Sequence, residues 1–131
     1  MTKTILAVDD SRTIRSAIEY TFGSTGIQVV GVDTGADALA NLGRLNAALV
    51  LVDVGLPEQD GYEVAKAIRG QAPGVPVLLL TSSVYPYDEP RAIEVGASGH
   101  IGKPFETQAL IDLVEQTIAE GAPASPAPAV A

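Results

Sequence analysis

The sequence contains no cysteine and few basic residues, and each of these absences argues against a class of protein. Without cysteine there is no disulfide framework, no thiolate metal site and no thiol nucleophile. Eight lysine and arginine residues stand against sixteen aspartate and glutamate residues, which gives a formal net charge of −8. This acidity disfavours nonspecific binding to nucleic acid or to an anionic membrane. We therefore expect neither kind of binding from this chain.

Long apolar runs are also missing. No stretch approaches the roughly 20 apolar residues that a membrane-spanning helix needs. The first residues lead directly into a strand-like segment and leave no room for a secretory signal, so a cytoplasmic location is expected. The 131 residues are 47% hydrophobic and 18% charged, as in one globular domain with a sizeable core.

Strand-like and helix-like segments alternate along the chain, which predicts an α/β fold with a parallel sheet. The predicted strands are residues 4–8, 27–32, 48–52, 75–80 and 98–101. The predicted helices are one from Ser11 to near Gly23, one from Thr34 to near Gly43, one at 62–69, a short one ending at Gly96, and one at 105–120. Residues 82–90, which include two prolines, are expected to form a long loop.

The domain is therefore expected to occupy residues 1–120. Residues 121–131 contain only Gly, Ala, Pro, Ser and Val, so they have no periodic face to pack. This composition is typical of a flexible tail or linker. Two interpretations stay open: a solvated terminus, or the beginning of a linker to a further domain.

Acidic residues and one lysine fall where the predicted strands end. Asp9 and Asp10 follow the first strand, and Asp53 follows the third. Thr81 follows the fourth strand, and Lys103 comes shortly after the fifth. In an open parallel sheet the carboxyl ends of the strands share one edge, where ligands bind. The five side chains are therefore predicted to meet in one pocket.

Such a pocket suits a divalent cation and a phosphoryl group. Three converging carboxylates repel one another, and Mg²⁺ or Mn²⁺ relieves this because these ions prefer oxygen ligands. Asp53 as a nucleophile would form an aspartyl phosphate. Lys103 and Thr81 supply a positive charge and a hydroxyl for the developing negative charge.

Each of these residues also has a structural interpretation. Asp9 and Asp10 could only favour a helix N-terminus, and Asp53 could be a turn residue. Thr81 could cap a loop, and Lys103 could be a solvated surface charge. Their common position at strand ends favours a functional site.

The chain resembles the response-regulator receiver domain, the CheY-like module of two-component signalling, over roughly residues 3–120. The matching motifs are ILAVDDS at 5–11, LVDVGLP at 51–57, Asp60-Gly61, LTS at 80–82, Gly96-Ala97 and KPF at 103–105. The resemblance implies a flavodoxin-like fold, with five parallel strands in the order 2-1-3-4-5 flanked by five helices.

The resemblance also implies roles for the acidic residues. Asp53 resembles the phosphoacceptor, which receives its phosphoryl group from a sensor histidine kinase or a phosphotransfer protein. Asp10 resembles a direct ligand of Mg²⁺ and Asp9 a ligand acting mainly through water. Asp53 and the backbone carbonyl of Gly55 complete the implied set. Such a domain is not an enzyme toward other substrates; it catalyses only its own phosphorylation and dephosphorylation.

Further implied residues concern switching. Thr81 resembles the hydroxyl residue that turns toward the phosphoryl group, Lys103 resembles the pocket lysine, and the bond before Pro104 is cis in the family. The surface of the fourth helix, fifth strand and fifth helix then binds a downstream protein. His100 stands where the family usually has an aromatic switch residue. It is interpreted either as a half-exposed strand residue or as a weaker, pH-sensitive switch.

The segment 84–90 carries two tyrosines, Tyr85 and Tyr87, which either anchor a partner or cover the end of the core. Gly55 is expected to leave water access open beside Asp53, so that Ser83 and this loop govern hydrolysis. The main alternative function is a pseudo-receiver that binds partners without phosphorylation. A flavodoxin is disfavoured because two carboxylates follow the first strand, and an aspartyl phosphatase because no Asp-x-Asp motif is present there.

Overall fold

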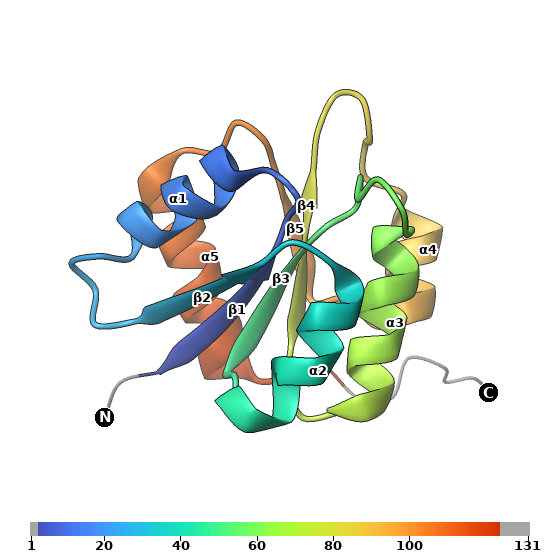
Figure 1. Cartoon of the computed structure of the whole chain (residues 1–131), viewed down its shortest axis with the longest axis horizontal. Coiled ribbons are helices and arrows are strands. Elements are labelled where there is room, and N and C mark those ends of the chain that lie inside the picture. Colours follow the sequence, from blue (N-terminus) through green and yellow to red (C-terminus); the bar gives the residue numbers. More distant parts are fainter. Residues whose placement is uncertain (1–2, 124–131) are drawn as a thin grey trace.

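The computed structural model describes residues 3–123 as a parallel sheet covered by helices on both faces (Figure 1). The strands are β1 (Thr4–Val8), β2 (Gln28–Val32), β3 (Leu49–Asp53), β4 (Val77–Thr81) and β5 (Gly99–Gly102). The helices are α1 (Arg12–Thr21), α2 (Gly35–Leu45), α3 (Gly61–Gln71), α4 (Glu89–Val95) and α5 (Thr107–Glu120). The strand order is β2-β1-β3-β4-β5, which confirms the expected fold.

The central strands are apolar because both of their faces are buried. In β3, Val50 and Val52 face a core cluster shared with α2, α3 and α4. The alternate residues Leu49 and Leu51 face a second cluster, shared with α1 and α5. Each of these side chains is fully buried, and each burial contributes about 1.5–3 kcal/mol relative to exposure. The sheet is therefore packed between two helical layers, with a hydrophobic cluster on each face.

Helix boundaries follow local capping. Ser11 and Thr34 cap α1 and α2 as expected, each accepting a backbone N–H with its hydroxyl. Gly43 lies near the end of α2 as expected, and the helix ends two residues later, at Leu45, where Asn46 adopts a left-handed conformation with φ 51°. Pro90 lies in the first turn of α4 and not in the preceding loop, since a first-turn residue needs no N–H.

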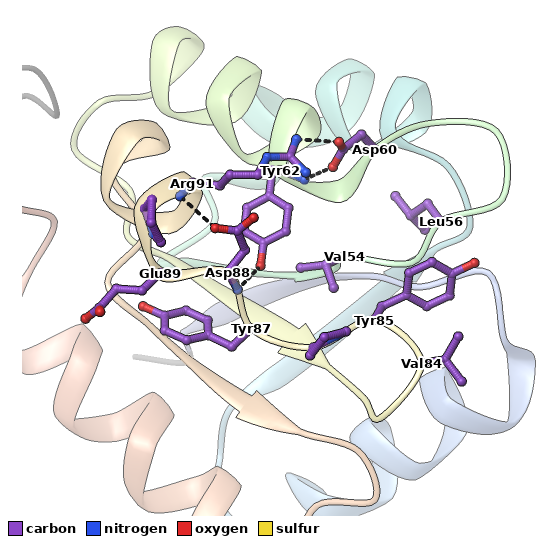
Figure 2. A pocket seen from close by; sticks show the side chains of 12 residues that line it. Val54, Leu56, Asp60, Tyr62, Val84, Tyr85, Tyr87, Asp88, Glu89 and Arg91 are labelled. Carbon is purple, nitrogen blue, oxygen red and sulfur yellow. Dashed lines mark hydrogen bonds and ion pairs between the residues drawn. The ribbon is translucent and has the colours of Figure 1, made fainter.

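The N-termini of α3 and α4 are joined by polar side chains (Figure 2). Arg91 forms an ion pair with Asp60, and its guanidinium lies 4.4 Å from the centroid of the Tyr62 ring. The Tyr62 hydroxyl accepts the backbone N–H of Asp88 at 2.8 Å. These contacts fix the end of the β4–α4 loop against the helix that follows β3.

The first residues of the predicted tail contact α3. Arg69, which is buried, donates to the carbonyl oxygen of Pro73 and, at 2.9 Å, to that of Pro123. Residues 124–131, most of the predicted tail, lie outside the described part. Between residues 3 and 123 no helix combines the length and the apolar character required to cross a membrane.

Gly61 permits the close approach of α3 to β3, which leads to a prediction. A Cβ at Gly61 would lie 2.9 Å from the carbonyl carbon of Asp53 and nearer still to the oxygen, so backbone must shift. We expect Gly61→Ala to lower the free energy of unfolding by about 1–3 kcal/mol in urea denaturation.

The matched control is Gly70→Ala in the same helix. Gly70 is exposed, and apart from its chain neighbours and the backbone of its own helix no described atom lies within 4 Å of a Cβ at that position. Since alanine is the better helix former, this variant should gain up to about 1 kcal/mol. Equal unfolding free energies for the two variants would contradict the packing argument.

Candidate functional site

Strand ends bring together the residues that the sequence singled out. Asp9 directly follows β1, and its N–H donates to the carbonyl of Val32 at 3.1 Å. Asp53 ends β3 and pairs with Leu80 in β4. Thr81, the last residue of β4, pairs with Gly102, which directly precedes Lys103.

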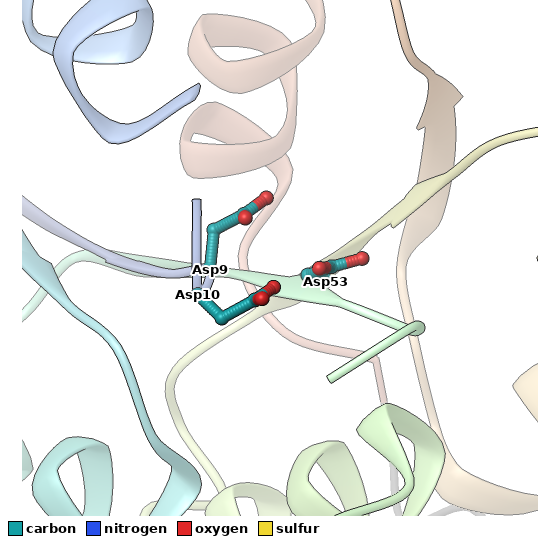
Figure 3. A group of neighbouring side chains, drawn as sticks. All are labelled: Asp9, Asp10 and Asp53. Atoms are coloured by element: carbon teal, nitrogen blue, oxygen red, sulfur yellow. The ribbon is translucent and has the colours of Figure 1, made fainter. Parts of the chain in front are cut away.

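Asp9, Asp10 and Asp53 form one acidic pocket (Figure 3). Each offers a carboxylate oxygen, and the three oxygens lie within 4.8 Å of one another. Asp9 is fully buried and Asp53 is 5% exposed, whereas Asp10 is exposed. The pocket is therefore a cluster with two buried members and one member open to solvent.

Lys103 lies against the two buried carboxylates. Its Nζ is 3.0 Å from Asp9 Oδ2 and 3.4 Å from Asp53 Oδ1. The peptide bond between Lys103 and Pro104 is cis, as the resemblance implied. The lysine thus neutralises part of the charge of the acidic pocket, as an interior ion pair requires.

Burial and charge set the ionisation of the pocket. Desolvation raises the pKa of Asp53 above its ordinary value, and the negative charge of Asp9 adds to this, although the Gly55 N–H and Lys103 oppose it. Desolvation acts to lower the pKa of Lys103, but its hydrogen bond with Asp9 and the two carboxylate charges outweigh burial and raise it. Lys103 therefore stays charged at neutral pH, and a further cation would favour the ionised form of Asp53.

The Thr81 side chain is buried and faces β5. Its Oγ1 donates a long hydrogen bond of 3.4 Å to the carbonyl oxygen of Ile101. The Thr81 carbonyl accepts the N–H of Lys103 at 2.7 Å. The hydroxyl is thus engaged with the fifth strand, and only a rotation of the side chain can redirect it.

Gly55 contacts Asp53 through its backbone, since its N–H donates to Asp53 Oδ1 at 3.0 Å. The metal-ligand role of its carbonyl stays a prediction. The expectation of open space beside Gly55 was wrong: the ring of Tyr85 fills it, and a Cβ at Gly55 would lie 2.8 Å from Tyr85 Cε2.

His100 is exposed on β5 and stacks on Tyr87. The two ring centroids are 3.6 Å apart with an interplanar angle of 11°. Tyr87 is half-buried against the core cluster under α2, α3 and α4, so it covers the core, while Tyr85 is 53% exposed. The role of His100 in switching stays a prediction.

Arg15 is a supporting residue that the sequence reasoning missed. Its Nη1 donates to the backbone carbonyl of Asp9 at 2.6 Å, while the N–H of Ser11 donates to Asp9 Oδ1 at 2.9 Å. Both contacts hold the loop that carries the acidic residues. The only signal in the sequence is the place of Arg15 one helical turn after the capping serine.

The donors of the acidic pocket fit a hard divalent cation. Asp9, Asp10 and Asp53 offer only oxygen, which is the ligand type that Mg²⁺ and Mn²⁺ prefer. Exposure of Asp10 leaves one side of the pocket open to water, and Mg²⁺ usually keeps several water ligands. The side chains present are therefore compatible with the expected metal.

Comparison with known proteins agrees with the resemblance to receiver domains. A family model described as the response regulator receiver domain matches residues 5–115. The response regulator protein FleR of Pseudomonas aeruginosa is 38% identical over 87% of this chain and 24% of FleR. The transcriptional regulatory protein PhoP of Bacillus subtilis is 35% identical over 80% of this chain and 44% of PhoP. The chain thus spans less than half the length of these two relatives.

Solved structures share the fold. Chemotaxis protein CheY4 of Vibrio cholerae has a TM-score of 0.82 at 31% identity, covering 88% of this chain and 98% of that one. A CheY-like receiver domain protein from Methanospirillum hungatei has a TM-score of 0.85 at 25% identity, covering 92% and 96%. By sequence and by fold, the chain belongs to the response regulator receiver domain family of two-component signalling.

Proposed function

We propose that this domain accepts a phosphoryl group on Asp53 from a histidine kinase or a phosphotransfer protein, and that phosphorylation changes its affinity for a downstream protein. The observation that carries the proposal is that Asp53 lies close to two other carboxylates and to Lys103 at the carboxyl edge of the sheet. Membership of the receiver family supports it.

In the transfer step an oxygen of the Asp53 carboxylate attacks phosphorus. One P–O bond forms, the bond from phosphorus to the donor nitrogen breaks, and the leaving imidazole retains the electron pair and takes up a proton. Lys103 stabilises negative charge on the phosphoryl oxygens. Mg²⁺ or Mn²⁺, held by Asp9, Asp10, Asp53 and the Gly55 carbonyl, would supply further positive charge there. The domain acts on itself only, so it is not an enzyme toward other substrates.

Switching then follows from competition for the Thr81 hydroxyl. Charged phosphoryl oxygens are stronger acceptors than the Ile101 carbonyl that this hydroxyl contacts at 3.4 Å. We expect the hydroxyl to turn toward Asp53 and to draw the β4–α4 loop with it. Tyr87 on this loop stacks on His100 of β5, so the movement alters the surface of α4, β5 and α5. That surface is the proposed site for the downstream protein.

The test is incubation with Mg²⁺ and phosphoramidate, followed by intact-mass measurement. We expect the mass of one phosphoryl group to appear, and its formation to slow at least about tenfold when a chelator removes the cation. The pseudo-receiver alternative, in which partners are bound without phosphorylation, predicts no added mass in either condition.

A further inference from the structure

The Tyr85 ring lies against Gly55, two residues after the proposed phosphoacceptor. A Cβ placed on Gly55 would overlap this ring, at 2.8 Å from Cε2 and nearer still to Cδ2. Gly55 in turn donates its N–H to Asp53 Oδ1 at 3.0 Å. The aromatic ring therefore packs directly on the residue whose backbone contacts the Asp53 carboxylate.

A tight turn holds Tyr85 in this position. The N–H of Ser82 donates to the Tyr85 carbonyl at 2.9 Å, and the N–H of Tyr85 donates to Ser82 Oγ at 3.1 Å. Tyr85 also lines a groove of about 720 Å³ with Leu56 and Val84 (Figure 2). Because Ser82 directly follows Thr81, the ring is connected to the residue that is proposed to move on phosphorylation.

Packing does not require this placement of the ring. Tyr85 is 53% exposed, and it belongs to neither of the two core clusters of the described residues. A half-exposed aromatic ring contributes little to the core, and this one covers the glycine whose N–H contacts the Asp53 carboxylate. Exclusion of water is a known means of protecting a reactive intermediate from hydrolysis.

We propose that the Tyr85 ring shields the phosphoryl group on Asp53 from water and so lengthens its lifetime, an inference that rests on the proposed function. In hydrolysis a water oxygen attacks phosphorus and forms a new P–O bond. The bond from phosphorus to Asp53 breaks, and its electron pair stays on the regenerated carboxylate. The water oxygen and its protons leave with inorganic phosphate. Tyr85 touches none of the reacting atoms and acts as a positioning residue that limits the approach of water.

The experiment compares decay rates of the phosphorylated protein. Wild type and Tyr85→Ala are phosphorylated with phosphoramidate and Mg²⁺, freed of donor by rapid desalting, and followed by intact mass. We expect the Tyr85→Ala adduct to decay about tenfold faster, which corresponds to ~1.4 kcal/mol of barrier. Thermal melting of both proteins verifies the fold, which the exposed position of Tyr85 should leave unchanged.

Two further variants separate shielding from other causes. Tyr85→Phe keeps the ring without the hydroxyl and should restore the wild-type lifetime. Tyr20→Ala removes a tyrosine that is 85% exposed on α1 and should decay as the wild type does.

The outcomes are distinct. Equal decay rates for wild type and Tyr85→Ala overturn the shielding role but leave phosphorylation of Asp53 intact. A Tyr85→Phe adduct that decays as fast as that of Tyr85→Ala overturns shielding by the ring in favour of a role for the hydroxyl. Absence of any adduct in the wild type overturns the proposed function and the shielding with it.

Discussion

Replacement of Asp53 by asparagine abolishes the phosphoryl adduct, and this is the largest effect that we expect. The amide has nearly the shape of the carboxylate but cannot form the acyl phosphate, because its nitrogen and its neutral oxygen are poor nucleophiles. Intact-mass measurement after incubation with phosphoramidate and Mg²⁺ should show only the unmodified mass. A variant that still gains one phosphoryl group would place the nucleophile elsewhere in the chain.

A matched control is Asp33→Asn. Asp33 also follows a strand, β2, and is exposed, but it is not a member of the acidic pocket. This variant should gain the phosphoryl mass at the wild-type rate. Loss of the adduct in both variants would show that any change of charge at this edge disturbs the reaction.

Unfolding does not explain the loss in Asp53→Asn. Burial raises the pKa of Asp53, so the ionised carboxylate is the form that is less favoured in the folded chain. Its folded-state pKa lies above the unfolded value, and the associated stability is present at low pH and is lost as pH rises through the raised pKa. At neutral pH in chelator the neutral amide should therefore melt no lower than the wild type.

The fold was predictable because its strongest signals are local. Val50 and Leu51 belong to an apolar run without polar alternation, and Ser11 and Thr34 precede helical periodicity, so strands and caps were correctly assigned. The observed ends of some strands differ from the predicted ends by a residue or two, because hydrogen bonding to the neighbouring strand extends the strand beyond its apolar residues. Asp53 is an example: its charge suggested that the strand ends before it, yet it pairs with Leu80 as the last residue of β3.

The acidic pocket was predictable because the carboxyl ends of the strands in a parallel sheet lie at one edge, independently of the conformation of the loops. Contacts made by loop side chains were not predictable, because they depend on the path of residues 82–88 and on individual rotamers. The Tyr85 ring on Gly55 and the stack of Tyr87 on His100 are of this kind. The ion pair of Arg91 with a residue 31 positions earlier is another. No spacing in the sequence indicates such pairs.

Replacement of Lys103 by methionine should slow phosphorylation of Asp53 by ~10²–10³-fold, the usual cost of removing one preorganised group that stabilises transition-state charge. Lys103 Nζ lies 3.4 Å from Asp53 Oδ1, close to where the phosphoryl oxygens would lie. The pKa of Lys103 is raised, so this amine carries a full positive charge at neutral pH. The rate of adduct formation with phosphoramidate, measured by intact mass at saturating Mg²⁺, tests this. Lys66→Met removes an exposed lysine from α3 and should keep the wild-type rate.

Metal binding separates this electrostatic role from a collapse of the pocket. Without Lys103 the buried carboxylates of Asp9 and Asp53 lose their shared cation, so in chelator the variant should melt below the wild type. The same loss makes the acidic pocket more negative, and Mg²⁺ should then raise the melting temperature of the variant by more than that of the wild type. Slow phosphorylation together with a weakened Mg²⁺ response would mean that the lysine acts by holding the acidic pocket in shape. Slow phosphorylation with a strengthened Mg²⁺ response would mean that the slower transfer results from loss of the Lys103 charge. In that case the metal site is intact while phosphoryl transfer to Asp53 is impaired.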